Sequence, residues 1–244
     1  MVISDIHLPY ASKVALELLW KFLPLYKPDR VVIAGDLIDM YSASKFLTHP
    51  DYGYSINDEL SQARAFLKKL RTKLPNARID FIEGNHDFRL RKYLLDNANK
   101  VASLEGIQLE NLLRLKEYEV RWKPVHKFST SFVDNWLTIE GVHIGHFNKA
   151  AADSGMTVRN LMLKRQGSFI QGHTHRAGLI LRRNMDGTQS FGVENPCLYD
   201  FGQAPYISDP NWQQGWTTIT DGMPELVLVT DNSFSYGGRI CTAS

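Results

Sequence analysis

Cysteine is scarce in this sequence, which has only Cys197 and Cys241 among its 244 residues. Two cysteines so far apart lack the paired spacing of a zinc site, and they can form at most one disulfide. A chain of this length buries roughly 70–75% of the surface that its unfolded form exposes, so it can fold without a disulfide framework. We therefore expect two free thiols and a cytoplasmic location, where the compartment keeps thiols reduced.

Long apolar runs and an excess of one charge are also missing. No stretch approaches the ~20 apolar residues of a membrane span, and the N-terminus lacks the pattern of a secretory signal. The 28 basic and 26 acidic side chains leave a formal net charge of only +2. Dedicated duplex-binding proteins usually carry a strongly basic face. No membrane partner is therefore expected, nucleic acid stays open but is not favoured, and the oligomeric state is undetermined.

The sequence does contain alternating strand and helix patterns, which favour a layered α/β domain. Short apolar runs predict strands that end near Ser4, Ala34 and Ile82. Helical spacing of apolar residues predicts helices over 12–26, 58–74 and 88–99, with a helical continuation over 101–115. The second half predicts strands over 136–139, 142–144, 168–171, 179–181 and 224–230, and a helix over 149–164. Because no linker or repeat interrupts these patterns, we expect a single domain over 1–244.

Residues Met40 to Asn57 show no periodicity and predict a long loop. Loops of this length without secondary structure are uncommon unless they are functional or disordered. The segment carries aromatic side chains, and Lys45 and His49 among its polar ones. It is therefore either a substrate-selecting segment or a surface loop that its aromatic residues anchor.

Five short polar clusters follow the predicted strands. They are Asp5-Ile6-His7, Gly35-Asp36-Leu37-Ile38-Asp39, Gly84-Asn85-His86-Asp87, Gly145-His146 and Gly172-His173-Thr174-His175. The carboxyl ends of strands are where α/β sheets place their ligand sites. Each cluster alone is a weak signal, but together they contain five of the eight histidines in the chain. Carboxylates combined with neutral imidazoles suit manganese, iron, zinc and related divalent ions, so the pattern predicts a metal site.

In their order and spacing, the five clusters resemble the signature of the calcineurin-like metallophosphoesterases, over residues 5 to 175. The Asn195-Pro196 pair also resembles a pair found in many relatives, although Cys197-Leu198 replaces the usual Gly-Ser after it. The resemblance implies a four-layered αββα sandwich of two mixed β-sheets flanked by helices. It also implies two divalent metal ions, for which we expect Mn²⁺, with Fe, Zn, Ni or Co as alternatives.

The resemblance assigns the metal ligands residue by residue. One metal would be held by Asp5, His7, Asp36 and His175, and the second by Asp36, Asn85, His146 and His173, so that Asp36 bridges the pair. Two ions with only two carboxylates leave the site net positive, which attracts phosphate and lowers the pKa of bound water. The expected nucleophile is therefore a metal-bridging hydroxide.

Further residues of the clusters have expected roles beside the metals. The resemblance makes His86 a catalytic residue that protonates the leaving oxygen, with Asp39 behind it as its hydrogen-bond partner. Asp87 is either a helix-capping residue or a catalytic one. Arg89 and Tyr41 are candidate substrate contacts, although Arg89 also fits a solvated helix face.

His143 is three residues before His146, and odd spacing on a strand places the two side chains on opposite faces. We therefore predict a structural role for His143.

The expected activity is metal-dependent hydrolysis of phosphate esters, by a phosphodiesterase that acts on nucleotides or nucleic-acid-derived substrates. A small phosphate ester or a nucleotide is thus the expected partner. The alternatives are a phosphomonoesterase or phosphoprotein phosphatase of the same family, and a non-catalytic binding module with the same fold. Degenerate members of the third kind lack ligands or the His of the Gly-Asn-His-Asp cluster, whereas this sequence has all of them.

Overall fold

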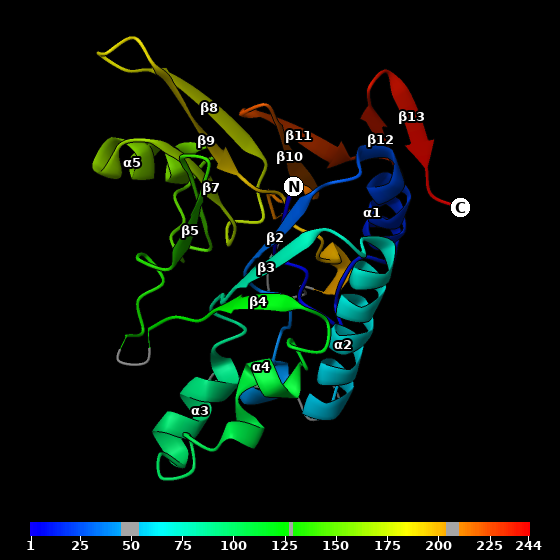
Figure 1. The fold of residues 1–244 in the computed structure, drawn as a ribbon, viewed down its shortest axis with the longest axis vertical. Coiled ribbons are helices and arrows are strands. Elements are labelled where there is room, and N and C mark those ends of the chain that lie inside the picture. The colour runs from blue at the N-terminus through cyan, green and yellow to red at the C-terminus, as the bar shows by residue number, and fades with distance from the viewer. Residues whose placement is uncertain (45–53, 127–128, 204–209) are drawn as a thin grey trace.

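Two mixed β-sheets form the centre of the protein in a computed structural model that describes residues 1–44, 54–126, 129–203 and 210–244 (Figure 1). The first sheet has six strands in the order β11-β10-β1-β2-β3-β4. Strands β1 to β4 run parallel, and β10 is antiparallel to both β1 and β11. Their bounds are β1 Val2–Ile3, β2 Arg30–Ala34, β3 Arg78–Ile82, β4 Val120–Lys123, β10 Gln214–Thr220 and β11 Met223–Val229.

The second sheet has five strands in the order β5-β6-β7-β9-β8. Its three inner strands are parallel, and the edge strands β5 and β8 run antiparallel to their neighbours. The bounds are β5 Trp136–Ile139, β6 Val142–Gly145, β7 Ser168–Gln171, β8 Gly178–Arg183 and β9 Gln189–Glu194. Gly141, at a φ of +80°, lies in the tight turn between β5 and β6.

The two sheets pack face to face. Val32 and Ala34 of the first sheet share a buried cluster with Ile144, Ile170 and Val193 of the second. Because side chains alternate across a strand, the intervening residues of β2 turn to the opposite face. There they join the larger core with α1 (Lys13–Tyr26) and α2 (Ile56–Lys73). Helix α5 (Met156–Arg165) packs through Val158 and Met162 on the outer face of the second sheet. The αββα sandwich that the resemblance implied is confirmed (Figure 1).

The remaining elements surround this sandwich. They are the 3₁₀ helices η1 (Tyr41–Ala43), η2 (Glu105–Ile107) and η3 (Phe201–Gln203), helices α3 (Arg89–Asn97) and α4 (Leu109–Leu112), and the hairpin of β12 (Ser233–Tyr236) and β13 (Arg239–Thr242). The hairpin packs on α1, where the rings of Phe22 and Phe234 meet edge to face. Helices α3 and α4 lie below the first sheet in Figure 1. No helix in the described ranges is long and apolar enough to cross a membrane.

Several sequence expectations differ from the structure. The helix expected over 149–164 begins only at Met156, because Gly155 before it has a φ of +79° and is not helical. The helical continuation over 101–115 consists only of η2 and α4. The sequence analysis did not predict β4, β9, β10, β12 and β13, since each is short or interrupted by polar residues and owes its position to pairing with another strand.

The segment Met40 to Asn57 was expected to be a loop throughout. Its first residues instead form η1, and α2 begins at Ile56 after the capping residue Ser55. Residues 45–53, which include Lys45 and His49, lie outside the described part of the chain. The prediction that this segment selects substrate stays a prediction.

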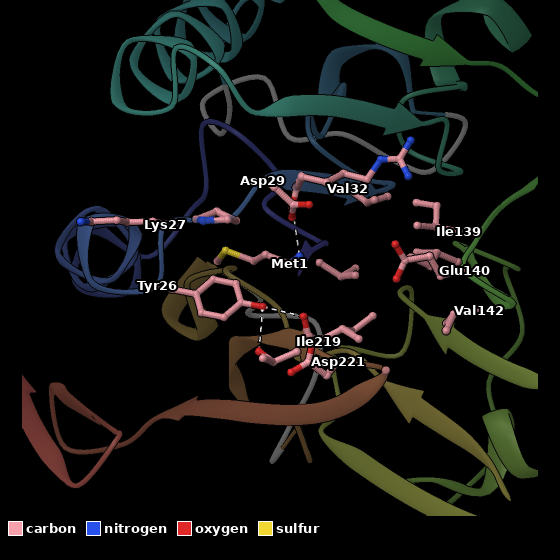
Figure 2. Close-up of a pocket in the computed structure, with 16 residues that line it drawn as sticks. Met1, Tyr26, Lys27, Asp29, Val32, Ile139, Glu140, Val142, Ile219 and Asp221 are labelled. Carbon is pink, nitrogen blue, oxygen red and sulfur yellow. Dashed lines mark hydrogen bonds between the residues drawn. The ribbon is translucent and has the colours of Figure 1, made fainter.

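A cavity of about 440 Å³ lies at the amino ends of the parallel strands. Figure 2 shows the residues that line it. Met1, Tyr26 and the Glu140 turn contribute to its lining, and the Tyr26 hydroxyl donates a hydrogen bond to the carbonyl of Ile219 over 2.7 Å. Burial lowers the pKa of the Met1 amine, which donates to the carbonyl of Arg30, to about 6. Within the described chain, the lining of this cavity includes none of the predicted site residues.

Candidate metal centre

The five polar clusters meet at one place in the structure, where strands of both sheets end. Asp5, Asp36 and Asn85 follow the parallel strands β1, β2 and β3, so the first sheet delivers them to a common edge. His146 follows β6, and His173 follows β7, in the second sheet. The face-to-face packing of the sheets brings these two sets of side chains together.

Three groups of side chains within this region could hold a metal ion. They are Asp5 with His7 and His175, His7 with Asp36 and His86, and Asp36 with His146 and His173. In each group the potential ligand atoms lie within 4.8 Å of one another. Asp36 belongs to two groups, which is the position that a bridging carboxylate requires.

The ligand atoms lie close together in two of these groups, that of Asp5, His7 and His175 and that of Asp36, His146 and His173. On one side, Nε2 of His7 lies 3.1 Å from Nε2 of His175, which is 3.3 Å from Oδ1 of Asp5. On the other side, Nε2 of His146 lies 3.2 Å from Nδ1 of His173 and 3.2 Å from Oδ2 of Asp36. Asn85 completes this second set, because its Oδ1 is 2.9 Å from Nε2 of His146. All seven predicted ligands are therefore brought together.

The outward ring nitrogens of two histidines are fixed by hydrogen bonds. Nδ1 of His146 lies 3.0 Å from the carbonyl of Ala34, and Nδ1 of His7 lies 2.9 Å from the Asp39 carboxylate. Each acceptor needs a proton on Nδ1, which leaves the lone pair of Nε2 directed into the site. A nitrogen and oxygen donor set of this kind fits divalent transition metals.

Ionisation of the side chains also suits metal binding. Burial raises the pKa of Asp5, but His175 and His146 outweigh burial and lower it to about 2. Burial together with neighbouring histidines lowers the pKa of His7 to about 4 and that of His173 to about 3. Both imidazoles are thus neutral near pH 7, the form that donates a lone pair.

His146 differs from these two histidines. Burial lowers its pKa, but the Asp36 carboxylate outweighs burial and raises the pKa to about 9. Near pH 7 a metal ion must therefore displace a proton from His146.

The backbone at the candidate ligands is unusual. Five of the seven have a left-handed conformation, with φ between +50° and +74°: Asp5, His7, Asp36, His173 and His175. A non-glycine residue in this conformation costs roughly 1–2 kcal/mol, and such strain concentrates at functional sites. Hydrogen bonds hold it in place, because the Asp5 carboxylate accepts from the amide of His173 and Asp36 Oδ1 accepts from the amide of His86.

Asp87 does not cap α3, whose N-cap residue is Phe88, and a catalytic role for Asp87 stays a hypothesis. Its buried carboxylate accepts hydrogen bonds from the backbone amides of Asp36, Ile38 and Gly84 at 2.8 to 3.2 Å. It thereby joins the loop after β2 to the loop after β3. The sequence could not show this, because two of the three amide partners, those of Asp36 and Ile38, are about 50 residues away in the chain.

Asp39 lies between three cationic or polar side chains at the rim of the site. Its carboxylate contacts Nδ1 of His86 at 3.1 Å, as the resemblance implied, and also Nδ1 of His7. Arg89 donates to Asp39 Oδ1 at 2.9 Å, and its other terminal nitrogen lies 3.2 Å from Nε2 of His86. Burial raises the pKa of Asp39, but His86 and His7 outweigh burial, so the carboxylate is ionised.

Aromatic residues that the sequence did not single out form a wall beside the first ligand group. The ring of Trp212 lies 4.4 Å from that of His175, and the ring of Tyr199 lies 5.1 Å from that of His7. Tyr41, a predicted substrate contact, packs edge to face with Tyr10 in the same aromatic cluster. The Asn195-Pro196 pair precedes Tyr199, but no pattern in the sequence marks Trp212.

His143 lies away from the metal ligands. Its Nδ1 is 2.9 Å from the Thr138 hydroxyl, and its ring packs against Phe169 on the α5 side of the sheet. The predicted structural position is confirmed.

Comparisons with known proteins agree with this site. The profile of the calcineurin-like phosphoesterases matches residues 1–177. Two proteins, each named Gene 54 protein, from Mycobacterium phages L5 and D29, are 30% identical over 98% of this chain and 97% of their own length.

Two solved structures show weaker likeness. Nuclease MPE of Pseudomonas putida is 13% identical with a TM-score of 0.37, over 98% of this chain and 84% of its own. Vps29 of Chaetomium thermophilum is 14% identical with a TM-score of 0.39, over 96% of this chain and 80% of its own. Likeness at this level says nothing of activity.

Proposed function

Because the chain belongs to the calcineurin-like phosphoesterase family, we propose that it is a metal-dependent phosphodiesterase of nucleotide or nucleic-acid-derived substrates. The family uses a dinuclear metal centre to hydrolyse phosphate esters. The observation that carries the proposal is the convergence of seven nitrogen and oxygen donors around Asp36, which belongs to two candidate metal groups. A protein that had lost this chemistry would have no need to retain five ligands in strained backbone conformations.

The two metal sites are proposed as follows. Asp5, His7, Asp36 and His175 would hold one ion, and Asp36, Asn85, His146 and His173 the other. Two such ions, with Mn²⁺ as the proposed pair, would supply an activated water and Lewis-acid stabilisation of the phosphate oxygens.

The side chains beside the metals handle the leaving group. Asp39 orients the imidazole of His86, and His86 protonates the oxygen that leaves. Arg89 contacts both residues, and the anionic phosphate of a bound diester would offer its guanidinium two oxygens for a bidentate pair. This exchange would free Nε2 of His86 to face the leaving oxygen.

The whole chain is proposed to form one catalytic domain. Residues after 177 supply β8, β9, β10 and β11 to the two sheets, as well as Tyr199 and Trp212 beside the site. A cytoplasmic location is proposed because Cys197 and Cys241 are both unpaired.

Turnover of a substrate panel tests the proposal. Purified protein with added Mn²⁺ should hydrolyse bis(p-nitrophenyl) phosphate, cyclic nucleotides or single-stranded DNA faster than p-nitrophenyl phosphate. A chelator should abolish turnover, and Asp36→Asn should remove at least one bound ion and lower the rate by orders of magnitude, because the shared negative charge is lost.

Three results would contradict this proposal. Faster turnover of the monoester would instead indicate a phosphomonoesterase or a phosphoprotein phosphatase. Absence of turnover by metal-loaded protein would indicate a binding module. Full activity after chelation would rule out a role for the metals.

A further inference from the structure

Helix α3 carries polar and aromatic side chains on a face where a packed helix carries apolar ones. The positions have the i, i+3, i+4, i+7, i+8 spacing of one helical face, and they are Arg89, Lys92, Tyr93, Asp96 and Asn97. All of α3 is described, and none of its residues is fully buried. Leu90, by contrast, packs against the main core. The helix is thus already anchored through another side, and its polar face is free for a different use.

This polar face lines an open cavity of about 570 Å³, which we call the α3 groove. Phe88 and Phe132 contribute apolar surface to the groove, with their buried rings edge to face at 5.8 Å. Protein sites for small ligands commonly have volumes of about 300–1,000 Å³. The groove therefore has room for a substantial part of a substrate.

The α3 groove is continuous with the candidate metal centre. Asn85, a proposed ligand of the second metal, belongs to its lining, and so does Arg89, which contacts Asp39 and His86. His86 thus lies at the end of the groove that meets the metals. Since His86 is proposed to protonate the leaving oxygen, the group attached to that oxygen has to extend into this groove.

The groove offers contacts for both a base and a phosphate. Tyr93 is 52% exposed, and an exposed aromatic ring is a stacking surface for any base. Lys92 pairs with Asp96 at 3.0 Å, but both side chains are about half exposed, so the pair is weak and open to exchange. Lys92 is about 4.5 Å further along the helix axis than Arg89, which spaces two cations along the groove.

We propose that the α3 groove binds the leaving arm of a single-stranded polynucleotide. The base of the departing nucleoside stacks on Tyr93, and the phosphate beyond it replaces Asp96 as the partner of Lys92. In the reaction the water oxygen bonds to phosphorus, the ester bond to the leaving arm breaks, and the released oxygen takes a proton from His86. The proton that the water loses passes to solvent, and His86 regains one from solvent. This inference rests on the proposed function and extends it to the substrate class.

The stacking contact is tested with Tyr93→Ala and, as a matched control, Leu95→Ala. Leu95 is on the same helix and 45% exposed, but it does not line the groove. On oligothymidylate and oligouridylate, Tyr93→Ala should lower kcat/KM at least about tenfold, whereas Tyr93→Phe and Leu95→Ala should not. The leaving ring of bis(p-nitrophenyl) phosphate is smaller than a nucleobase and carries no phosphate beyond it, so Tyr93→Ala should lower hydrolysis of this ester less than that of the oligonucleotides. Tyr93→Phe and Leu95→Ala should leave it within about twofold.

The charge contact is tested with two changes that should act in opposite directions. Lys92→Gln should lower kcat/KM on oligonucleotides at low salt, and Asp96→Asn should raise it, because Lys92 is then free for phosphate. Neither change should affect the dinucleoside monophosphate TpT, whose leaving nucleoside has no second phosphate.

Each outcome separates the inference from the proposed function. Equal losses on oligonucleotides and on the small diester, or no loss on either, would overturn the groove assignment while hydrolysis itself stands. Failure of the unchanged protein to hydrolyse any of these esters would instead overturn the proposed function, and the inference with it. Effects on both oligonucleotides support a contact that does not depend on the sugar, whereas an effect on one alone supports the groove and identifies DNA or RNA as its ligand.

Discussion

At the scale of single residues, the site depends on side chains that have more than one partner. Asp36 belongs to two candidate metal groups, and its carboxylate also accepts a hydrogen bond from the amide of His86. Asp39 contacts His7, His86 and Arg89, and so connects a proposed ligand to the proposed acid. Substitution of Asp36 or Asp39 should therefore lower turnover more than substitution of a side chain that has a single partner. The losses of turnover from two such substitutions should not be additive when they are combined.

The role of His86 can be separated from that of the ligands. His86 could also be a metal ligand, because its ring nitrogen lies within 4.8 Å of potential ligand atoms on His7 and Asp36. If His86 is the acid, His86→Ala should keep the metal content of the unchanged protein while kcat falls by roughly 10²–10⁴. The loss should be smaller for p-nitrophenyl esters, whose leaving group needs little protonation. Metal analysis decides the matter, since loss of an ion in this variant would make His86 a ligand.

At the scale of elements, the loops that leave the strands position the ligands, and they have little free space. The loop after β3 passes so close to the loop after β2 that a side chain at Gly84 would collide with the carboxylate and amide of Asp36. Asp87 joins the same two loops through three backbone amides. The position of Asp36 is thus set by its neighbours as well as by its own strand.

Gly84→Ala should consequently damage the metal site. The added methyl group displaces Asp36, and a misplacement of about 1 Å at a reacting centre can lower the rate about a hundredfold. We expect at least one bound metal ion to be lost and turnover to fall by about that factor or more. Gly106→Ala is the control, because no described atom lies within 4 Å of the added methyl group. Unchanged metal content in Gly84→Ala would show that the two loops adapt more easily than their contacts indicate.

At the scale of the whole molecule, the sandwich buries several carboxyl groups, and one of them affects stability. Glu59, in the first turn of α2, is fully buried. Burial, and then the nearby Asp39 carboxylate, raises its pKa to about 7, while the amides of Met40 and Ser42 and the Arg89 side chain oppose the shift only in part. The folded protein therefore keeps a proton on Glu59 at pH values where the unfolded chain, with an ordinary pKa of 4.5, has released it.

This difference predicts a loss of stability as pH rises. The stabilising contribution is complete below pH 4.5 and declines through the window between 4.5 and about 7. At pH 8, Glu59→Gln should raise the free energy of unfolding by up to about 3 kcal/mol, because the amide does not ionise. At pH 4.5 and below, the gain should vanish.

Urea unfolding at pH 8 and at pH 4.5 measures the effect of Glu59→Gln. The exposed Glu105 provides a control in Glu105→Gln, which should change neither value. A gain of the same size at both pH values would mean that the substitution acts through packing and not through ionisation.

The sequence by itself determined which donor residues are available to the candidate site and most of the parallel strands that lead to it. Apolar runs followed by Asp, Asn, Gly and His are local patterns, so β1, β2, β3, β6 and β7 and all seven donor residues can be identified from the chain alone. Only the tertiary structure decided which donors face one another, because residues such as Asp5 and His175 are far apart in the chain and meet when the two sheets pack.

The same reason explains what the sequence did not predict. Strands β4 and β10 are stabilised by pairing with strands distant in the chain, β3 and β1, and two of the three amide partners of Asp87 come from another loop. The polar face of α3 fits a solvated helix equally well until the cavity beside it is seen. Local patterns specify which residue types are available, whereas burial, pairing and close approach between distant segments specify what each of them contacts.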